Sequence, residues 1–183
     1  HHQAWVLSRM RIEITKLPKW KDVITIKTWI KTLENSRSVR CLEMYLNDEK
    51  IVGCETFWVV INTKTRRPDN LALPHAHFEK FDTDSISKQI LKINIPEEFT
   101  FKNERKILLS DIDIVNHANN VKYLEWCLDV TKVENVLSNK IKALNLNYLQ
   151  ELNYNDTIEI HHTTTSFLIT KEGKSCFALE VEM

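Results

Sequence analysis

An acid, an imidazole and two amides stand together in the middle of the chain, immediately before a segment with helical periodicity. They are Asp113, His117, Asn119 and Asn120. From Val121 onward, apolar residues recur at helical spacing and charged residues fill the other side. This pattern predicts a helix over residues 119–137 with a buried stripe that includes Leu124, Cys127 and Leu128. An asparagine at position 119 or 120 is a favourable N-cap for it.

The start of this helix is a candidate binding site for a carbonyl oxygen. Backbone N–H groups at a helix start point outward, and partial positive charge gathers there. We therefore expect Ala118, Asn119 and Asn120 to contact a substrate. His117 lies beside this point and can act as acid or base, because an imidazole changes its protonation near neutral pH. Asp113, four residues earlier, can turn back to orient the ring or to charge it.

A plainer interpretation of the same residues is an Asx-rich turn that only caps a helix. In that case His117 is a surface histidine, or one whose hydrogen bonds are satisfied within the fold. The spacing alone favours neither interpretation.

The composition excludes several classes of partner and cofactor. The chain has 183 residues, of which 43% are hydrophobic, enough to form the core of one large domain or two small ones. Its 25 basic and 25 acidic residues balance, so no global field draws it to nucleic acid or to an anionic membrane. Only two glycines occur, which excludes a glycine-rich phosphate loop, and we expect no cofactor.

The cysteines and the apolar runs indicate the compartment. The four cysteines are far apart and form no paired spacing, which argues against a metal site and against a disulfide framework. No apolar run approaches the roughly 20 residues that span a bilayer, and no signal peptide opens the chain. We expect no membrane insertion and a cytoplasmic protein, or one of the plastid stroma if it comes from a plant.

The hydrophobic pattern divides the chain into two halves rich in strands. The first half alternates at period two over residues 6–14 and 24–30, and a hairpin joins 39–46 to 51–61, which predicts an antiparallel sheet. From 62 to 100 the periodicity fades, with one short helical candidate at 85–91. The second half predicts a strand, the loop and helix above, and three further strands. These strands cover 102–109, 142–153, 157–170 and 174–183.

One helix followed by long antiparallel strands predicts an α+β fold in which a sheet wraps around the helix, the hotdog arrangement. We predict a tandem hotdog with a first domain at 1–63, a linker at 64–100 and a second domain at 101–183 that carries the loop and helix. If both halves share one fold, a leading strand and helix would precede Trp5, so the first hotdog is incomplete in this chain.

Five segments carry a resemblance to a known family. They are Trp5–Met10, Phe57–Val60, Thr65–Pro68, Ser110–Trp126 and Tyr148–Glu151. In this order and spacing the chain resembles, along nearly its whole length, the plant and bacterial acyl-acyl-carrier-protein thioesterases. These are double-hotdog enzymes that release fatty acids from the carrier.

The resemblance implies a set of catalytic residues. The family loop reads Asp, any residue, Asn, any residue, His, and a distal glutamate completes the site; Asp113, His117 and Glu151 match it. Val115 stands in place of the asparagine, and Asn116 comes one residue later, where an extended segment would face it the other way. Either the loop is rearranged so that Asn116 serves, or the protein works without that amide.

The implied activity is hydrolysis of fatty acyl-acyl carrier protein in fatty acid biosynthesis. Glu151 would take a proton from water, the helix start and His117 would stabilise the oxygen, and Asp113 would hold the loop. The converse division, with His117 as base and Glu151 as its orienting group, stays open. Two rival functions also stay open: an acyl-coenzyme A hydrolase, and a catalytically silent acyl-binding protein.

The implied partner is an acidic carrier protein, which a neutral enzyme must attract through a local cationic patch. Lys64, Arg66 and Arg67 form one candidate docking patch. A second candidate patch consists of Lys102, Arg105 and Lys106. Two hotdogs in one chain already imitate the common hotdog dimer, so further pairing need not follow and a homodimer stays open.

Overall fold

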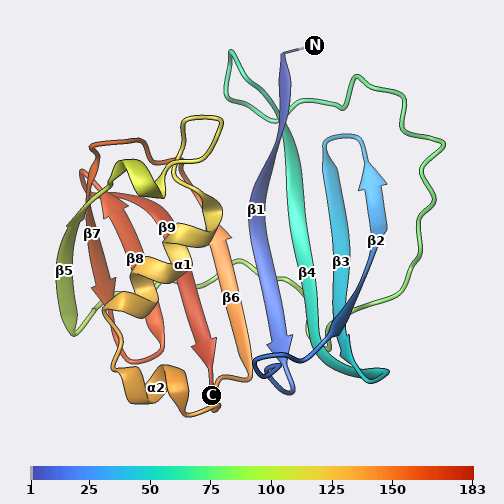
Figure 1. Cartoon of the computed structure of the whole chain (residues 1–183). Coiled ribbons are helices and arrows are strands. Elements are labelled where there is room, and N and C mark those ends of the chain that lie inside the picture. Colours follow the sequence, from blue (N-terminus) through green and yellow to red (C-terminus); the bar gives the residue numbers. More distant parts are fainter. Residues whose placement is uncertain (1) are drawn as a thin grey trace. The chain divides into compact units, whose positions relative to one another are not determined.

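The computed structural model describes residues 2–183, and the chain forms two compact units, His1–Leu91 and Lys92–Met183 (Figure 1). Unit 1 contains four antiparallel strands in the order β2-β3-β4-β1. They are β1 (Gln3–Ile14), β2 (Ile24–Glu34), β3 (Arg37–Leu46) and β4 (Glu49–Asn62). The antiparallel sheet predicted for the first half is therefore present, and residues 2–91 contain strands and connecting segments without a helix.

The predicted hairpin of unit 1 turns at Asn47 and Asp48. Both residues have positive φ, 49° and 63°. A two-residue turn of this type suits the twist of the flanking strands, and Asn and Asp adopt positive φ more readily than other residues with a side chain. The register follows, with Leu46 opposite Glu49 and Met44 opposite Val52.

The segment after β4 packs back onto unit 1, and Gly53 is the residue that permits its close approach. The carbonyl oxygen of Ser85 lies 1.9 Å from where a Cβ would stand on Gly53. The hydroxyl of Ser85 donates to the Cys54 carbonyl at 2.7 Å, and its N–H donates to the buried Glu55 carboxylate at 3.2 Å. The short helix predicted for 85–91 is wrong, because backbone N–H groups here donate to carboxylates of the sheet instead of to carbonyls within the segment.

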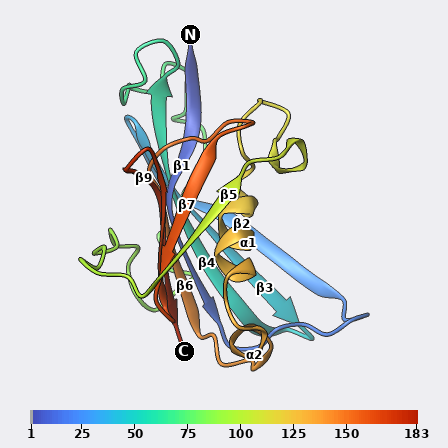
Figure 2. The same ribbon diagram turned by 90° about the vertical axis from the view of Figure 1, so that its left-hand side faces the viewer.

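Unit 2 contains five antiparallel strands in the order β6-β9-β8-β7-β5, with a helix on one face. Figure 1 shows α1 in front of β7, β8 and β9, and Figure 2, turned by 90°, shows it to one side of those strands. The strands are β5 (Phe101–Lys106), β6 (Ala143–Tyr148), β7 (Thr157–His162), β8 (Ser166–Lys171) and β9 (Lys174–Glu182). The helices are the 3-10 turn η1 (Leu109–Asp111), α1 (Asn120–Asp129) and α2 (Val133–Leu137).

The helix predicted over 119–137 is divided, because the chain leaves the helical path after Asp129. The chain turns at Thr131, whose hydroxyl donates to the Cys127 carbonyl at 2.9 Å and whose N–H donates to the Leu128 carbonyl at 2.9 Å. Val130 and Thr131 are β-branched, which lowers their helix propensity. The deepest buried residues of α1 are Tyr123, Trp126 and Cys127, so the buried stripe is rotated from the one predicted through Leu124 and Leu128.

Two strand predictions also need correction. The strand expected over 142–153 ends at Tyr148, because the N–H groups of Leu149 and Gln150 both donate to the Cys176 carbonyl and the regular ladder stops there. The strand expected over 157–170 is a hairpin of β7 and β8. Thr163 forms its turn by accepting hydrogen bonds from the N–H groups of residues 165 and 166 through its hydroxyl.

Candidate active site

The loop between η1 and α1 is closed on itself by Asp113. Its carboxylate Oδ1 accepts hydrogen bonds from the N–H groups of Val115 at 2.9 Å and His117 at 3.2 Å. Its own N–H donates to the His117 carbonyl at 2.8 Å, and its carbonyl accepts from the N–H of Asn116 at 3.1 Å. The Asp113 side chain therefore holds the backbone of the loop, and the hydrogen bonds described for it do not reach the imidazole.

Asn116 and Val115 form the tip of this turn. Asn116 has a φ of 66°, a left-handed conformation that asparagine tolerates, so its residue type is explained by the turn itself. The structure gives its side chain no hydrogen-bond partner within residues 2–183. The Val115 side chain, in the place of the family's asparagine, is 64% exposed. Neither residue contributes a polar group that is seen to contact His117.

The helix start is built as the sequence predicts, but most of its N–H groups are already occupied. Asn119 is the N-cap, and its side-chain oxygen accepts from the N–H of Val121 at 3.0 Å. The N–H of Ala118 donates to the Leu152 carbonyl at 2.8 Å, and that of Asn119 donates to the Asp111 carbonyl at 2.8 Å. Of the three N–H groups expected to face substrate, only that of Asn120 has no acceptor within residues 2–183.

A buried acid that the sequence reasoning did not select anchors the base of the loop. Asp111 is 2% exposed, and its carboxylate accepts from the Leu108 N–H at 2.9 Å and lies 3.5 Å from the Arg105 guanidinium. That guanidinium also lies 5.4 Å from the centre of the Trp126 ring. The spacing of two acids at 111 and 113 was the signal that could have found it. Asp111 is buried, and Asp113 closes the loop.

Glu151 follows β6 in an irregular segment, and it meets His117. The Nε2 atom of His117 lies 3.5 Å from Oε2 of Glu151, and the two side chains are 36% and 35% exposed. The Leu152 carbonyl beside Glu151 accepts the N–H of Ala118 next to His117, so one backbone hydrogen bond joins the two segments. An imidazole and a carboxylate at this distance, each about one third exposed to water, can exchange a proton and share one bound water.

The predicted docking residues Lys64, Arg66 and Arg67 lie on an exposed turn directly after β4. The turn is shaped by Asn62, whose side-chain oxygen accepts from the N–H groups of residues 64 and 65. In the second candidate patch, Lys102 forms an ion pair with Glu159 at 2.6 Å, and Arg105 is directed to Asp111. Two of the three cations in the second patch thus have acidic partners.

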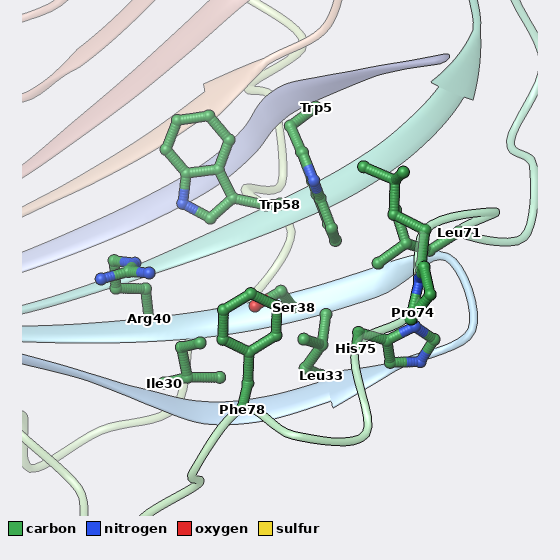
Figure 3. Close-up of a pocket in the computed structure, with 11 residues that line it drawn as sticks. Trp5, Ile30, Leu33, Ser38, Arg40, Trp58, Leu71, Pro74, His75 and Phe78 are labelled. Carbon is green, nitrogen blue, oxygen red and sulfur yellow. The ribbon is translucent and has the colours of Figure 1, made fainter. Parts of the chain in front are cut away.

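Unit 1 contains a separate apolar cavity of about 280 Å³. In Figure 3 the rings of Trp5, Trp58 and Phe78 surround this space, with Arg40 at one end and Pro74 at the other. The remaining lining residues are Ile30, Leu33, Ser38, Leu71, Leu73 and His75.

Other kinds of site find little support within residues 2–183. No group of three His, Cys, Asp or Glu side chains there is arranged to hold a metal ion, and none of the helices has the length and apolar composition that crossing a membrane requires. The four cysteines are free and buried. Burial, followed by the neighbouring Glu55, raises the pKa of Cys41 to about 11, and burial raises that of Cys54 to about 12. Neither thiol is a ready nucleophile.

Comparison with known families assigns both units. Residues 84–181 match the acyl-ACP thioesterase C-terminal domain, and residues 1–73 match the acyl-ACP thioesterase N-terminal domain. The chain belongs to the acyl-ACP thioesterase family. The C-terminal domain match includes the loop at 110–119, α1 and Glu151.

Relatives of this chain include plant proteins. It is 30% identical over 182 residues to oleoyl-acyl carrier protein thioesterase 1, chloroplastic, of Arabidopsis thaliana, a match that covers 90% of this chain and 49% of the relative. It is 29% identical over 167 residues to palmitoyl-acyl carrier protein thioesterase, chloroplastic, of Cuphea hookeriana, covering 85% and 40%. The chain thus spans about half the length of the curated relatives it matches.

Solved structures of similar proteins confirm the predicted hotdog fold. An acyl-ACP thioesterase from Bacteroides thetaiotaomicron superposes with a TM-score of 0.85 at 23% identity, covering 99% of this chain and 76% of the other. The 12:0-ACP thioesterase from Umbellularia californica superposes with a TM-score of 0.80 at 19% identity, covering 99% and 75%.

Proposed function

We propose that this protein hydrolyses fatty acyl thioesters of acyl carrier protein, releasing a free fatty acid in fatty acid biosynthesis. The observation that carries the proposal is the approach of His117 and Glu151 to 3.5 Å beside the start of α1. Family membership and the names of the relatives support the same activity.

In the proposed reaction, Glu151 takes a proton from a water molecule while the water oxygen attacks the thioester carbonyl carbon. The carbonyl oxygen becomes negative, and the N–H of Asn120 and the ring of His117 stabilise it. The tetrahedral intermediate then collapses, the carbon–sulfur bond breaks, and the proton held by Glu151 passes to the departing thiolate. The products are a fatty acid and the free thiol of the carrier.

We further propose that the carrier docks on Lys64, Arg66 and Arg67. These residues are exposed, and they lie within a stretch of four residues on one turn. An acidic carrier would gain a salt-dependent attraction there. Glutamate at all three positions should raise KM for the carrier-bound substrate at low salt with little change in kcat. The matched control replaces Lys16, Lys19 and Lys21, an exposed cationic group in another connection of the same unit.

The apolar cavity of unit 1 is a second observation in favour of a fatty acyl substrate. Aromatic and aliphatic side chains dominate its lining, which suits a hydrocarbon chain, and Arg40 and His75 are the ionisable residues in it. Substitution of Trp58 by alanine should therefore change the preference among acyl chain lengths without abolishing hydrolysis.

The test is release of free thiol from acyl carrier protein thioesters of several chain lengths, in parallel with the same acyl groups on coenzyme A. We expect faster release from the carrier protein, and loss of release in Glu151→Gln but not in Glu172→Gln, which alters an exposed carboxylate in the β8–β9 turn. Equal rates on both carriers would favour the coenzyme A hydrolase. No release from any thioester would favour the silent acyl-binding protein, for which Val115 is the specific observation.

A further inference from the structure

A buried phenol on α1 bonds to the main chain on both sides of Glu151. The hydroxyl of Tyr123 accepts a hydrogen bond from the N–H of Leu152 at 3.1 Å, and it donates to the carbonyl of Gln150 at 3.5 Å. A phenol supplies one donor and can also accept, so these two roles use the group fully. The residue between the two contacts is Glu151.

The Tyr123 ring is held rigidly, so its hydroxyl is a fixed point. The side chain is 3% exposed, and its ring centroid lies 5.3 Å from that of Trp126 and 5.4 Å from that of Phe177. Burial raises the pKa of Tyr123 above its ordinary value, so the hydroxyl keeps its proton and remains both donor and acceptor. Tyr123 also lies four residues beyond Asn119, on the first turn of the helix that begins three residues after His117.

Glu151 lies outside the regular ladder of the sheet, so contacts on both sides of it set its position. The ladder of β6 stops at Tyr148, three residues earlier, and residues 149–153 have no regular structure. Backbone hydrogen bonds join the residues flanking Glu151 to two neighbouring segments: the N–H of Gln150 donates to the Cys176 carbonyl of β9, and the carbonyl of Leu152 accepts from the N–H of Ala118. Tyr123 adds a contact from α1 on each side of Glu151, at the Gln150 carbonyl and at the Leu152 N–H.

We propose that Tyr123 is a positioning residue that sets the Glu151 carboxylate against His117, and this inference rests on the proposed function. It does not touch substrate. It acts by fixing the main chain that carries the carboxylate, so its effect is on alignment in the transition state and not on substrate affinity. Misplacement of a reacting group by about 1 Å can cost about 10²-fold in rate.

The first test is Tyr123→Phe, which keeps the ring and removes the hydroxyl. We expect kcat for acyl carrier protein thioester hydrolysis to fall about 10- to 100-fold while KM stays within about 2-fold. Tyr154→Phe is the matched control, because Tyr154 is half exposed, lies three residues after Glu151, and has no described partner for its hydroxyl. Ile158→Val, in the buried core of the same unit, controls for a general loss of stability.

The deciding test combines Tyr123→Phe with Glu151→Asp. The aspartate withdraws the carboxylate by one methylene, so alignment is already lost and the rate remains measurable. If Tyr123 acts through Glu151, adding Tyr123→Phe to Glu151→Asp lowers kcat by less than about 2-fold. If the wild-type protein is active and the losses of kcat from the two substitutions multiply, the role of Tyr123 is refuted while the proposed function stands. A wild-type protein that releases no thiol would overturn the proposed function, and this inference with it.

Discussion

Replacement of Asp113 separates two ways in which this carboxylate can serve the site. In the structure its Oδ1 atom accepts from the N–H groups of Val115 and His117, and no bond to the imidazole is described. Asparagine keeps an oxygen at that position and can accept both hydrogen bonds, whereas alanine can accept neither. The pair Asp113→Asn and Asp113→Ala therefore distinguishes a role in loop geometry from a role of the negative charge.

The magnitude follows from the two bonds. A net hydrogen bond contributes about 0.5–1.5 kcal/mol, and more when one partner is charged, but water competes at this partly exposed loop, so we assign about 1 kcal/mol to each. Loss of both, about 2 kcal/mol, corresponds to about a 30-fold loss of kcat/KM if the loop is misplaced in the transition state. Asparagine bonds are about half as strong, which limits the loss for Asp113→Asn to about 5-fold.

The assay is thiol release from an acyl carrier protein thioester, with thermal unfolding to show that both variants are folded. We predict that Asp113→Asn retains most of the activity and that Asp113→Ala does not. Equal, large losses in the two variants would refute this reasoning, because they would mean that the charge of the carboxylate acts on His117 directly.

Three further predictions concern stability and reactivity. Asn119→Ala should cost about 1 kcal/mol and lower Tm by about 2–4 °C through loss of the cap, while Asn119→Asp should unfold close to wild type in the same thermal scan. Burial raises the pKa of Asp156, but hydrogen bonds from Lys171 and Asn153 outweigh it and hold the pKa below its usual value. The ionised Asp156 carboxylate therefore stabilises the folded state above the unfolded pKa of about 3.9, and this stabilisation is lost as the pH falls through the lower folded pKa. Asp156→Asn lacks this carboxylate, so its urea midpoint should fall less than that of wild type between pH 5 and pH 2. Finally, a disulfide reagent at pH 8 should find no reactive thiol in the folded protein and four after unfolding, and fast labelling of the native state would contradict the burial of Cys41, Cys54, Cys127 and Cys176.

Local rules predicted much of the fold where local interactions decide it. The alternation in residues 6–14 and 24–30 identified β1 and β2, and the asparagine at 119 identified the helix start, because capping depends on neighbouring residues alone. The break after Asp129 and the turn at Thr163 were missed. Both depend on threonine hydrogen bonds to the backbone, with no glycine or proline to mark them.

The candidate site likewise contains residues that local spacing selects and residues that it does not. Asp113 and His117 were selected as candidates from local spacing, but Glu151 was selected only through the resemblance, since nothing in the sequence distinguishes it from an ordinary strand carboxylate. Asp111 and Tyr123 were not selected at all. Their roles depend on groups that are distant in sequence, such as the N–H of Leu152, which lies 29 residues from Tyr123. Which N–H groups at the helix start have an acceptor within the fold likewise depends on tertiary contacts. The N–H groups of Ala118 and Asn119 have one, and that of Asn120 is left to face a substrate.

The central claim is that His117 and Glu151 act together on one water and one thioester. It is tested most directly by a double-mutant cycle on kcat with His117→Ala and Glu151→Gln. If the two side chains work as one unit across their 3.5 Å separation, the double variant should lose about as much activity as the more damaged single variant. Losses that multiply in the double variant would contradict the account, because they would show that the two residues act separately.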